Sequence, residues 1–411
     1  MPLDLRKVIT QLRNLESQES INLKQERLGS TYRLFKSACE DYKKLLERLL
    51  ETKSSKKANF FFATPEHKLN ENLSLENLIE CNKNFSLPHV VVGTDGSQIN
   101  PSNHEITSTF LINIGQVCIP YFSSNIPVLL TSKPAVYNSL EEINSISSGD
   151  VVDEDLVSYE RTLKEVEELV ELAKSYKSHN LPIVALLDGT LIHWHLEKFS
   201  NVFIEHFINR FSKSIHELKS LGIPVVSVLS NSRSNDLINM LRIFKCPYEI
   251  VDCKKHCSDI NSKNLPCNPC MDYKPVFDRR LVEEYFIKQN AALGTRTIVF
   301  ESNNKILGYY PGDLKIYFFY INTGTEIARV ELPAYVACDK KLLELVHNVI
   351  FLQCKVGFGY PVVLSEAHLQ AVVTRSDRQV FYDLMKEHML KTKQMPLKVS
   401  SKELRKRVSF V

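Results

Sequence analysis

Two aspartates occupy matching positions, each at the end of an apolar run and directly before a glycine. Asp95 lies in VVVGTDGSQI, residues 90–99, and Asp188 lies in IVALLDGTLIHW, residues 183–194. Both runs are rich in β-branched and aliphatic residues, which predicts buried strands that end in an Asp-Gly turn. Ligands of α/β proteins bind where strands end, and carboxylates held there suit Mg²⁺ or Mn²⁺. We predict that the two aspartates share a metal, with ordinary turn chemistry as the alternative for each.

The elements around these aspartates indicate an α/β fold. Strand-like runs from residue 88 to 132 predict adjacent, antiparallel strands. A long charged helix is predicted over residues 151–178, and strand and helix then alternate from residue 183 to 244. A late strand group over residues 297–332 precedes a helix at 340–356. This order places both aspartates on strands, with helices between and after them.

The pattern divides the chain into three parts. Residues 1–86 are an N-terminal helical extension, with apolar residues at three- and four-residue spacing, and a polar linker. Residues 87–390 are the main domain, in which residues 246–275 form a cysteine-bearing insertion. Residues 391–411 are a basic tail, which either attracts phosphate through counterion release or is only a disordered, solubilising end.

The composition is that of an ordinary globular protein. The chain has 411 residues, of which 44% are hydrophobic and 24% charged, with a net charge of +3. That charge does not by itself indicate nucleic acid. No apolar stretch reaches about 18 residues, so we expect no contact with a membrane. The N-terminus also lacks a signal-peptide apolar region. We therefore expect a cytoplasmic protein whose cysteines are thiols or metal ligands rather than disulfides.

Four cysteines are grouped as C-x3-C-x9-C-x2-C, and these are Cys253, Cys257, Cys267 and Cys270. Four thiols so close together suit a tetrahedral structural Zn²⁺ site. An iron–sulfur cluster is the alternative metal centre. Unligated thiols or a redox pair are the alternatives without metal. Cys246 and His256 are further ligands nearby.

Three blocks, taken in their order and spacing, resemble the NurA nuclease domain from about residue 90 to 378. These blocks are TDGS, LLDGTLI and GYPVVLSEAH. IARVELPAYVA and SNSRSNDLINMLR also resemble bacterial, especially cyanobacterial, members. The resemblance implies a fold similar to ribonuclease H, that is, a mixed sheet with flanking helices. Residues 87–390 would then be the nuclease domain.

The resemblance also implies an activity and partners. NurA proteins are metal-dependent DNA nucleases that prefer manganese, with 5′-to-3′ exonuclease and single-strand endonuclease activity. They act in the resection of double-strand breaks. Family members form ring-like homodimers, and archaeal members work with the hexameric translocase HerA. For this chain we therefore expect DNA as substrate, a homodimer and a HerA-type partner.

Five residues match the family's site by position. Asp95 and Asp188 match its two metal-binding aspartates. The family also uses a glutamate on the preceding helix, for which we choose Glu165, because its spacing from Arg161 resembles the family's. A solvated helix face is the alternative, and Glu167, Glu168 and Glu171 are the other candidates.

Tyr360 and His368 match the family's tyrosine and histidine in the last block. His368 would ligate metal or move a proton, and Tyr360 would hydrogen-bond a phosphate oxygen. Without the resemblance, His368 would be a core or helix-start histidine.

Arg233, in SNSR, follows a predicted strand where many family members place a basic residue, and its planar fork suits phosphate. A helix N-cap formed by Ser232 or Ser234 is the other interpretation of this segment.

Two other function classes compete with the nuclease. The chain could be a non-catalytic DNA-end or partner-binding module that kept the fold, although it retains both aspartates, Tyr360 and His368. It could also be a different metal hydrolase, such as a phosphatase that uses the same carboxylates.

Overall fold

The computed structural model describes residues 4–13, 18–66, 74–101, 109–123, 125–138, 153–257 and 276–392. These residues form a mixed α/β fold of nine strands, mostly antiparallel, with flanking helices. The α/β class predicted from the sequence is confirmed. No helix within these ranges combines the length and apolar character needed to span a bilayer.

The chain divides into two compact units. The first comprises Met1–Cys81, Ser230–Lys305 and Tyr317–Val330, and the second comprises Asn82–Leu229, Ile306–Ile316 and Glu331–Val411. This division groups the N-terminal residues with later segments of the chain. The three parts inferred from the sequence remain a prediction, and residues 393–411 of the basic tail lie outside the described residues.

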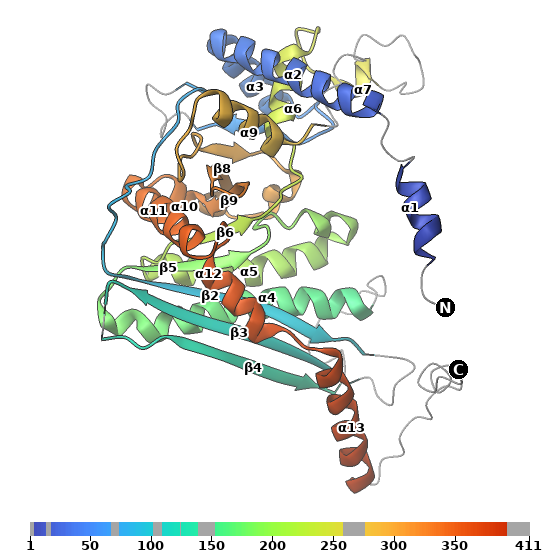
Figure 1. Cartoon of the computed structure of the whole chain (residues 1–411), viewed down its shortest axis with the longest axis vertical. Helices are drawn as coiled ribbons and strands as arrows, with labels where there is room; N and C mark the ends of the chain where they lie inside the picture. Colours follow the sequence, from blue (N-terminus) through green and yellow to red (C-terminus); the bar gives the residue numbers. More distant parts are fainter. Residues whose placement is uncertain are drawn as a thin grey trace. The chain divides into compact units, whose positions relative to one another are not determined.

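The second unit contains a five-stranded part of the sheet in the order β4-β3-β2-β5-β6. Its strands are β2 (His89–Ile99), β3 (Phe110–Tyr121), β4 (Leu129–Tyr137), β5 (Ile183–Asp188) and β6 (Val225–Leu229). The strands β2, β3 and β4 pair antiparallel, as predicted, while β5 pairs parallel with both β2 and β6 (Figure 1). The parallel pairs require crossovers, which the intervening helices provide.

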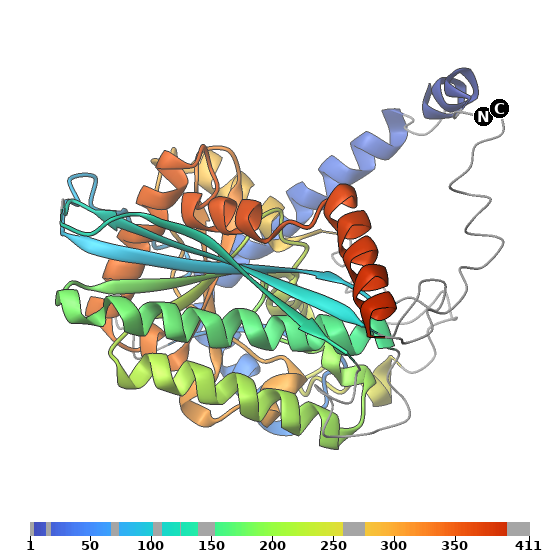
Figure 2. The same ribbon diagram turned by 90° about the horizontal axis from the view of Figure 1, so that it is seen from below.

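Helices cover both faces of these strands. The helices α4 (Asp153–Tyr176) and α5 (Asn201–Ser220) lie on one face, and α12 (Val362–Ala371) lies on the other. In Figure 2 the green helices α4 and α5 lie below the strands, and the orange-red segment that contains α12 lies above them. The apolar residues of α5 recur every three or four positions and are buried, among them Phe203, Phe207 and Phe211. Each such burial stabilises the fold by about 2 kcal/mol.

The remaining elements of the second unit surround this core. They are η2 (Lys177–His179), η3 (Trp194–Lys198), η5 (Gly312–Leu314), α10 (Ala334–Ala337), α11 (Lys340–Val356) and α13 (Arg375–Lys391), and most of η4 (Lys305–Tyr309). Helix α13 begins with a capping box between Thr374 and Asp377, and the side chain of Asp339 caps α11. These side-chain oxygens accept hydrogen bonds from the otherwise unpaired first amides of each helix.

The first unit is built from short strands and helices. Its elements are α1 (Leu5–Arg13), α2 (Gln18–Glu40), α3 (Tyr42–Ser55), β1 (Ala63–Pro65), α6 (Asp236–Lys245), α7 (Cys253–His256), α9 (Asp278–Lys288) and β7 (Phe300–Ser302), together with most of β8 (Ile316–Asn322) and the first part of β9 (Ile327–Pro333). The strand β7 pairs antiparallel with β1 and β8. The predicted N-terminal helices are present, as three helices rather than one or two.

A buried charge network lies at the centre of the first unit. The guanidinium of Arg329, 1% exposed, contacts the carboxylate of Asp236 at 2.9 Å. Asp278 accepts hydrogen bonds from the Tyr320 hydroxyl and from two amides of the first turn of α6, at 2.9 to 3.0 Å. Burial, together with the negative charge of Asp236, raises the pKa of Asp278 to about 6. One arginine therefore faces two buried carboxylates, and its single charge offsets only one of them when both are ionised.

Candidate functional site

The alternation of side chains along β2 sends neighbouring residues to opposite faces of the sheet. Thr94 and Gly96 face α4, because the Thr94 hydroxyl donates to the backbone carbonyl of Glu165 at 2.8 Å, and a Cβ on Gly96 would meet Glu165 Oε1 at 2.5 Å. Asp95 and Ser97 face α12, where the Ser97 hydroxyl donates to the last turn of the helix. Asp95 is therefore directed toward α12.

The prediction that Asp95 lies in a turn after its strand is wrong. The strand β2 continues to Ile99, because β3 pairs with it along its whole length. The parallel neighbour β5 is the strand that ends near Asp95, since its pairing with β2 stops at Thr94 and Leu187. Asp95 is the next residue of β2, on an edge that β5 no longer covers.

Asp188 does lie at the end of its strand, as predicted. It is the last residue of β5, its side chain accepts a hydrogen bond from the Gly189 amide at 2.8 Å, and Gly189 has a φ of +82°. That left-handed conformation favours glycine. Because Thr94 pairs with Leu187, the residues that follow them, Asp95 and Asp188, come next to each other across the two strands.

Glu165 approaches these aspartates from α4. Its side chain is 15% exposed, and its Oε1 lies 3.2 Å from Arg161 Nε. Burial raises the pKa of Glu165 to about 7, against the lowering effect of Arg161, and the negative charges of Asp95 and Asp188 raise it further. The three carboxylates therefore interact electrostatically. The lack of a side chain on Gly96 leaves the space that the Glu165 carboxylate occupies.

The other candidate glutamates of α4 have different partners. Glu167 pairs with Lys164 and Arg210, Glu168 with Lys133, and Glu171 with Lys174, each at 2.7 Å. Of the four glutamates considered from the sequence, the structure brings Glu165 to the two aspartates.

The segment GYPVVLSEAH places Tyr360 beside Asp188 and His368 beside Asp95. His368 Nδ1 lies 2.7 Å from Asp95 Oδ2, and the imidazole is 66% exposed. Tyr360 lies close enough to Asp188 that burial, together with the charge of Asp188, raises the pKa of the phenol well above its usual value. Tyr360 therefore stays a protonated donor near neutral pH. All five residues matched by position thus lie in the second unit and interact with one another.

Sequence reasoning missed the residues that support this cluster. Arg161 entered only as a spacing reference, although its ion pair with Glu165 joins positions i and i+4 of one helix, a signal visible in the sequence. Glu331, 1% exposed, accepts from the Thr190 hydroxyl and the Leu191 amide, both at 2.8 Å, and so holds the turn after Asp188. No local pattern predicts this contact, because Glu331 lies 140 residues after Leu191 in the chain.

Arg233 belongs to the first unit, where its side chain is exposed. The alternative that Ser232 or Ser234 caps the next helix is wrong. Helix α6 begins at Asp236, and the Asp278 carboxylate accepts from its first amides instead. Ser234 bonds to Ser232 within the preceding loop.

The predicted cysteine site is only partly described. Cys253 lies in α7, and the Cys257 amide donates to its carbonyl at 2.9 Å, so the two residues are one helical turn apart. Cys267 and Cys270 lie outside the described residues. A site of four cysteines stays a prediction.

Across the described ranges, no group of three or more His, Cys, Asp or Glu side chains is arranged to hold a metal ion. At the carboxylate cluster, Asp95 is bonded to His368 and Glu165 is paired with Arg161. The donor chemistry nevertheless suits Mg²⁺ or Mn²⁺, which prefer carboxylate oxygens. For a metal ion to bind here, the ion must replace the present side-chain partners of these carboxylates.

Comparison with known families gives one match. The model of the NurA domain family matches residues 89–373. That range includes all five residues of the cluster and excludes α1, α2, α3 and α13. No curated protein matches the chain.

Proposed function

The chain belongs to the NurA family of nucleases, which act on DNA, and we propose that it is a metal-dependent deoxyribonuclease that hydrolyses phosphodiester bonds. We further propose 5′-to-3′ exonuclease and single-strand endonuclease activity, used in processing the ends of double-strand breaks. The observation that carries this proposal is the electrostatic interaction of Asp95, Glu165 and Asp188, with His368 bonded to Asp95 and Tyr360 beside Asp188.

In this proposal the three carboxylates hold one or two Mn²⁺ or Mg²⁺ ions. Such an ion positions a water and stabilises the leaving oxygen of a phosphodiester. Carboxylates from two neighbouring strands and one helix suit this task, because the backbone holds each of them rigidly. The raised pKa of Glu165 supports the same assignment, because burial and the neighbouring negative charges disfavour its ionised form and a cation at this site would offset them.

His368 and Tyr360 have separate proposed roles. The hydrogen bond of His368 Nδ1 to Asp95 leaves Nε2 on an exposed ring, where it can ligate metal or deliver a proton to the leaving group. The protonated phenol of Tyr360, beside Asp188, can donate a hydrogen bond to a phosphate oxygen. Both roles use atoms at the same cluster.

Several further proposals rest on the family. A ribonuclease H-like fold is supported by the mixed sheet of the second unit, with three antiparallel strands followed by two parallel ones. A homodimer and a HerA-type translocase partner follow from the family alone. Arg233 is proposed to contact DNA phosphate, supported by its exposure.

Structural Zn²⁺ at Cys253, Cys257, Cys267 and Cys270 is proposed from the spacing of the thiols. Elemental analysis of the purified protein and of Cys253→Ser tests it. About one zinc per chain, lost in the variant, is expected, and its absence from the wild type would exclude the site.

Cleavage of end-labelled DNA tests the main proposal. Single- and double-stranded substrates are incubated with Mn²⁺, Mg²⁺ or EDTA, and wild type is compared with Asp95→Ala and Asp188→Ala. We expect metal-dependent cleavage that each substitution abolishes while the fold, followed by circular dichroism, is retained. The position of the label gives the polarity of digestion.

Two outcomes would overturn the proposal. If the wild type binds DNA but never cuts it, alone or with a translocase, the chain is a binding module. If it hydrolyses small phosphate esters and leaves DNA intact, it is a different metal hydrolase.

A further inference from the structure

Arg161 is the one arginine or lysine, among the residues described, that forms an ion pair with a carboxylate of the cluster. Its Cγ and Cδ lie against Gly96, 2.8 and 3.1 Å from where a Cβ would be. The side chain runs across β2 at the residue after Asp95. A cation is therefore fixed beside Glu165, on the α4 face of β2 and one residue after Asp95.

Within the described residues, the guanidinium of Arg161 forms a single ion pair, with Glu165. Its Nε is buried and lies 3.2 Å from Glu165 Oε1, in an ion pair without hydrogen-bond geometry. Within the described part of the chain it donates no hydrogen bond, and the side chain is 32% exposed. Arg210 on α5 differs, because its two terminal nitrogens form three hydrogen bonds of 2.6 to 3.0 Å with Glu160 and Glu167. The terminal nitrogens of the Arg161 guanidinium can therefore bind a further anion.

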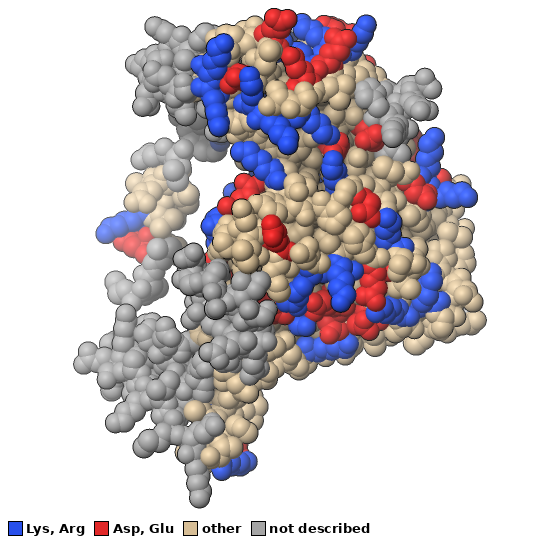
Figure 3. Space-filling view, turned by 180° about the vertical axis from the view of Figure 1, so that it is seen from behind, with Lys and Arg blue, Asp and Glu red and all other residues tan. Residues whose placement is uncertain are grey.

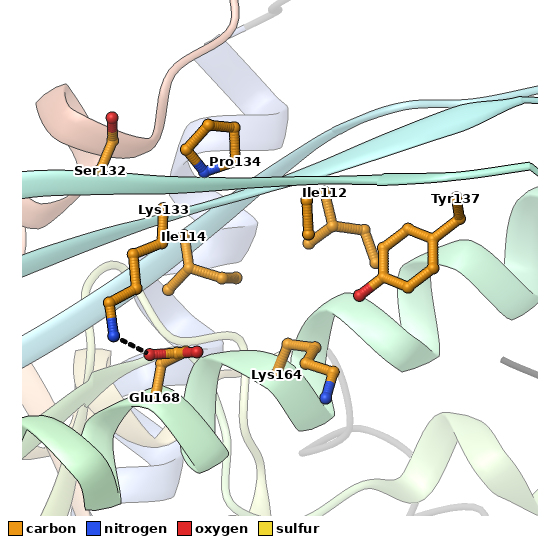
Figure 4. Close-up of a pocket in the computed structure, with 9 residues that line it drawn as sticks. Ile112, Ile114, Ser132, Lys133, Pro134, Tyr137, Lys164 and Glu168 are labelled. Atoms are coloured by element: carbon orange, nitrogen blue, oxygen red, sulfur yellow. Dashed lines mark hydrogen bonds and ion pairs between the residues drawn. The ribbon is translucent and has the colours of Figure 1, made fainter. Parts of the chain in front are cut away.

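Other cations near α4 already have anionic partners. An open pocket of about 520 Å³ lies between α4, β3 and β4, and two lysines line it. Figure 4 shows the ammonium group of Lys133 directed at Glu168, 2.7 Å away, and Lys164 is paired with Glu167 at 2.7 Å. Acidic and basic side chains are also interspersed on the face shown in Figure 3. A free cationic track for phosphate is not evident there.

We propose that Arg161 binds a phosphate of the DNA at the carboxylate cluster, exchanging Glu165 for the phosphate oxygens. This inference rests on the proposed nuclease function. Three carboxylates repel a phosphodiester, so the substrate needs cations at the site. A guanidinium suits this task because its planar fork matches two phosphate oxygens. The exchange would leave the buried Glu165 carboxylate without Arg161, so a divalent cation bound at the site has to replace that charge.

The salt dependence of DNA binding tests the contact directly. Anisotropy of a labelled single-stranded oligonucleotide with cleavage-resistant phosphorothioate linkages is measured from 50 to 200 mM salt in Mn²⁺. Each phosphate contact contributes about 0.7 to the slope of log K against log salt on a single strand. We expect Arg161→Gln to reduce the slope by about that amount and to raise the Kd about tenfold at low salt. Arg161→Lys should keep the slope.

A charge-matched control lies on the same helix. Lys174 pairs with Glu171 and Glu217, and it is thirteen residues after Arg161, which is ~20 Å along the helix. Lys174→Gln removes the same charge and should leave the slope unchanged. An equal loss in both variants would mean that only net charge matters, which would overturn the inference.

Manganese affinity separates phosphate binding from a positioning role. If Arg161 only held Glu165 in place, Arg161→Gln would weaken Mn²⁺ binding in calorimetry and leave the salt slope intact. In our proposal, the Arg161→Gln variant binds Mn²⁺ at least as tightly as wild type, because the arginine that competes with the metal for Glu165 is absent. If wild type cuts DNA while the slope is unaffected by Arg161→Gln, the inference fails alone. If wild type does not cut DNA, the proposed function fails, and the slope still tests the contact.

Discussion

Gly115 of β3 lies directly opposite Asp95 of β2, and the backbone of α12 fills the place where its side chain would be. A Cβ on Gly115 would lie 2.2 Å from the carbonyl oxygen of Ala367. Asn113, two residues before, donates to the carbonyl of Ala371 at 2.9 Å and holds the end of the same helix. This close approach brings His368 within hydrogen-bond distance of Asp95.

Substitution of Gly115 should therefore affect both stability and the site. In Gly115→Ala the methyl group forces α12 away from the sheet, which we expect to lower the free energy of unfolding by about 1–3 kcal/mol. Cleavage should fall because His368 moves from Asp95. Gly308→Ala is the control, since nothing lies within 4 Å of its added Cβ. Chemical denaturation and cleavage rates check this, and a Gly115→Ala protein as stable and active as the control would contradict it.

The turn that carries Asp188 depends on the half-buried hydroxyl of Thr190. Thr190 donates to Glu331 and accepts from the Ile192 amide at 2.9 Å. Thr190→Val keeps the shape but removes one hydrogen bond from Glu331, which still accepts from the Leu191 amide, and leaves the Ile192 amide without the hydroxyl. This should lower the free energy of unfolding by about 1–2 kcal/mol. The cleavage rate should fall more than DNA affinity, because Asp188 shifts. Thr190→Ser retains the hydroxyl and should behave like wild type, so equal rates and melting temperatures for the valine and serine variants would refute this.

Acid should destabilise the second unit through His193. This imidazole is 3% exposed, its Nε2 has no hydrogen-bond partner among the described residues, and burial lowers its pKa to about 3. Between that value and about 6.5, the unfolded chain takes up a proton that the folded one does not. The unfolded state then binds more protons, so stability falls as the pH is lowered.

Replacement of His193 should remove that contribution. We expect His193→Phe to reduce the pH dependence of the unfolding free energy by about 1.4 kcal/mol per pH unit over this range. The ring would still pack against Phe207 and Phe211. His179→Asn, at an exposed position, is the control. Urea denaturation at pH 5, 6 and 7 measures the slope, and a slope unchanged in His193→Phe would rule out this source.

The buried network of the first unit should tolerate loss of its arginine poorly. Arg329→Met leaves Asp236 and Asp278 without their cation, so we expect a loss of about 3–5 kcal/mol at pH 7. The loss should be smaller at pH 5, where Asp278, with its raised pKa, is protonated. Arg280→Met breaks an exposed pair with Glu283 and should change the unfolding free energy by only about 0.5 kcal/mol. Chemical denaturation at pH 7 and pH 5 measures these losses. Equal losses in Arg329→Met and Arg280→Met would contradict the prediction.

The sequence by itself determined the elements with strong local patterns. Period-two and apolar runs predicted β2, β3, β4 and β5, and helical spacing predicted α4, α5 and α11, because these patterns follow from which face of an element is buried. It also identified the family by short blocks whose order is specific. The acidic residues of the cluster could be selected because their types limit the chemistry available.

Only the tertiary structure decided how these residues meet. That Asp95 lies within a strand follows from pairing with β3, which a local Asp-Gly signal cannot reveal. The choice of Glu165 over its neighbours depends on the space above Gly96, and the contact of Glu331 with Thr190 joins residues far apart in the chain. Such contacts arise from packing between elements, and local propensity carries no information about them.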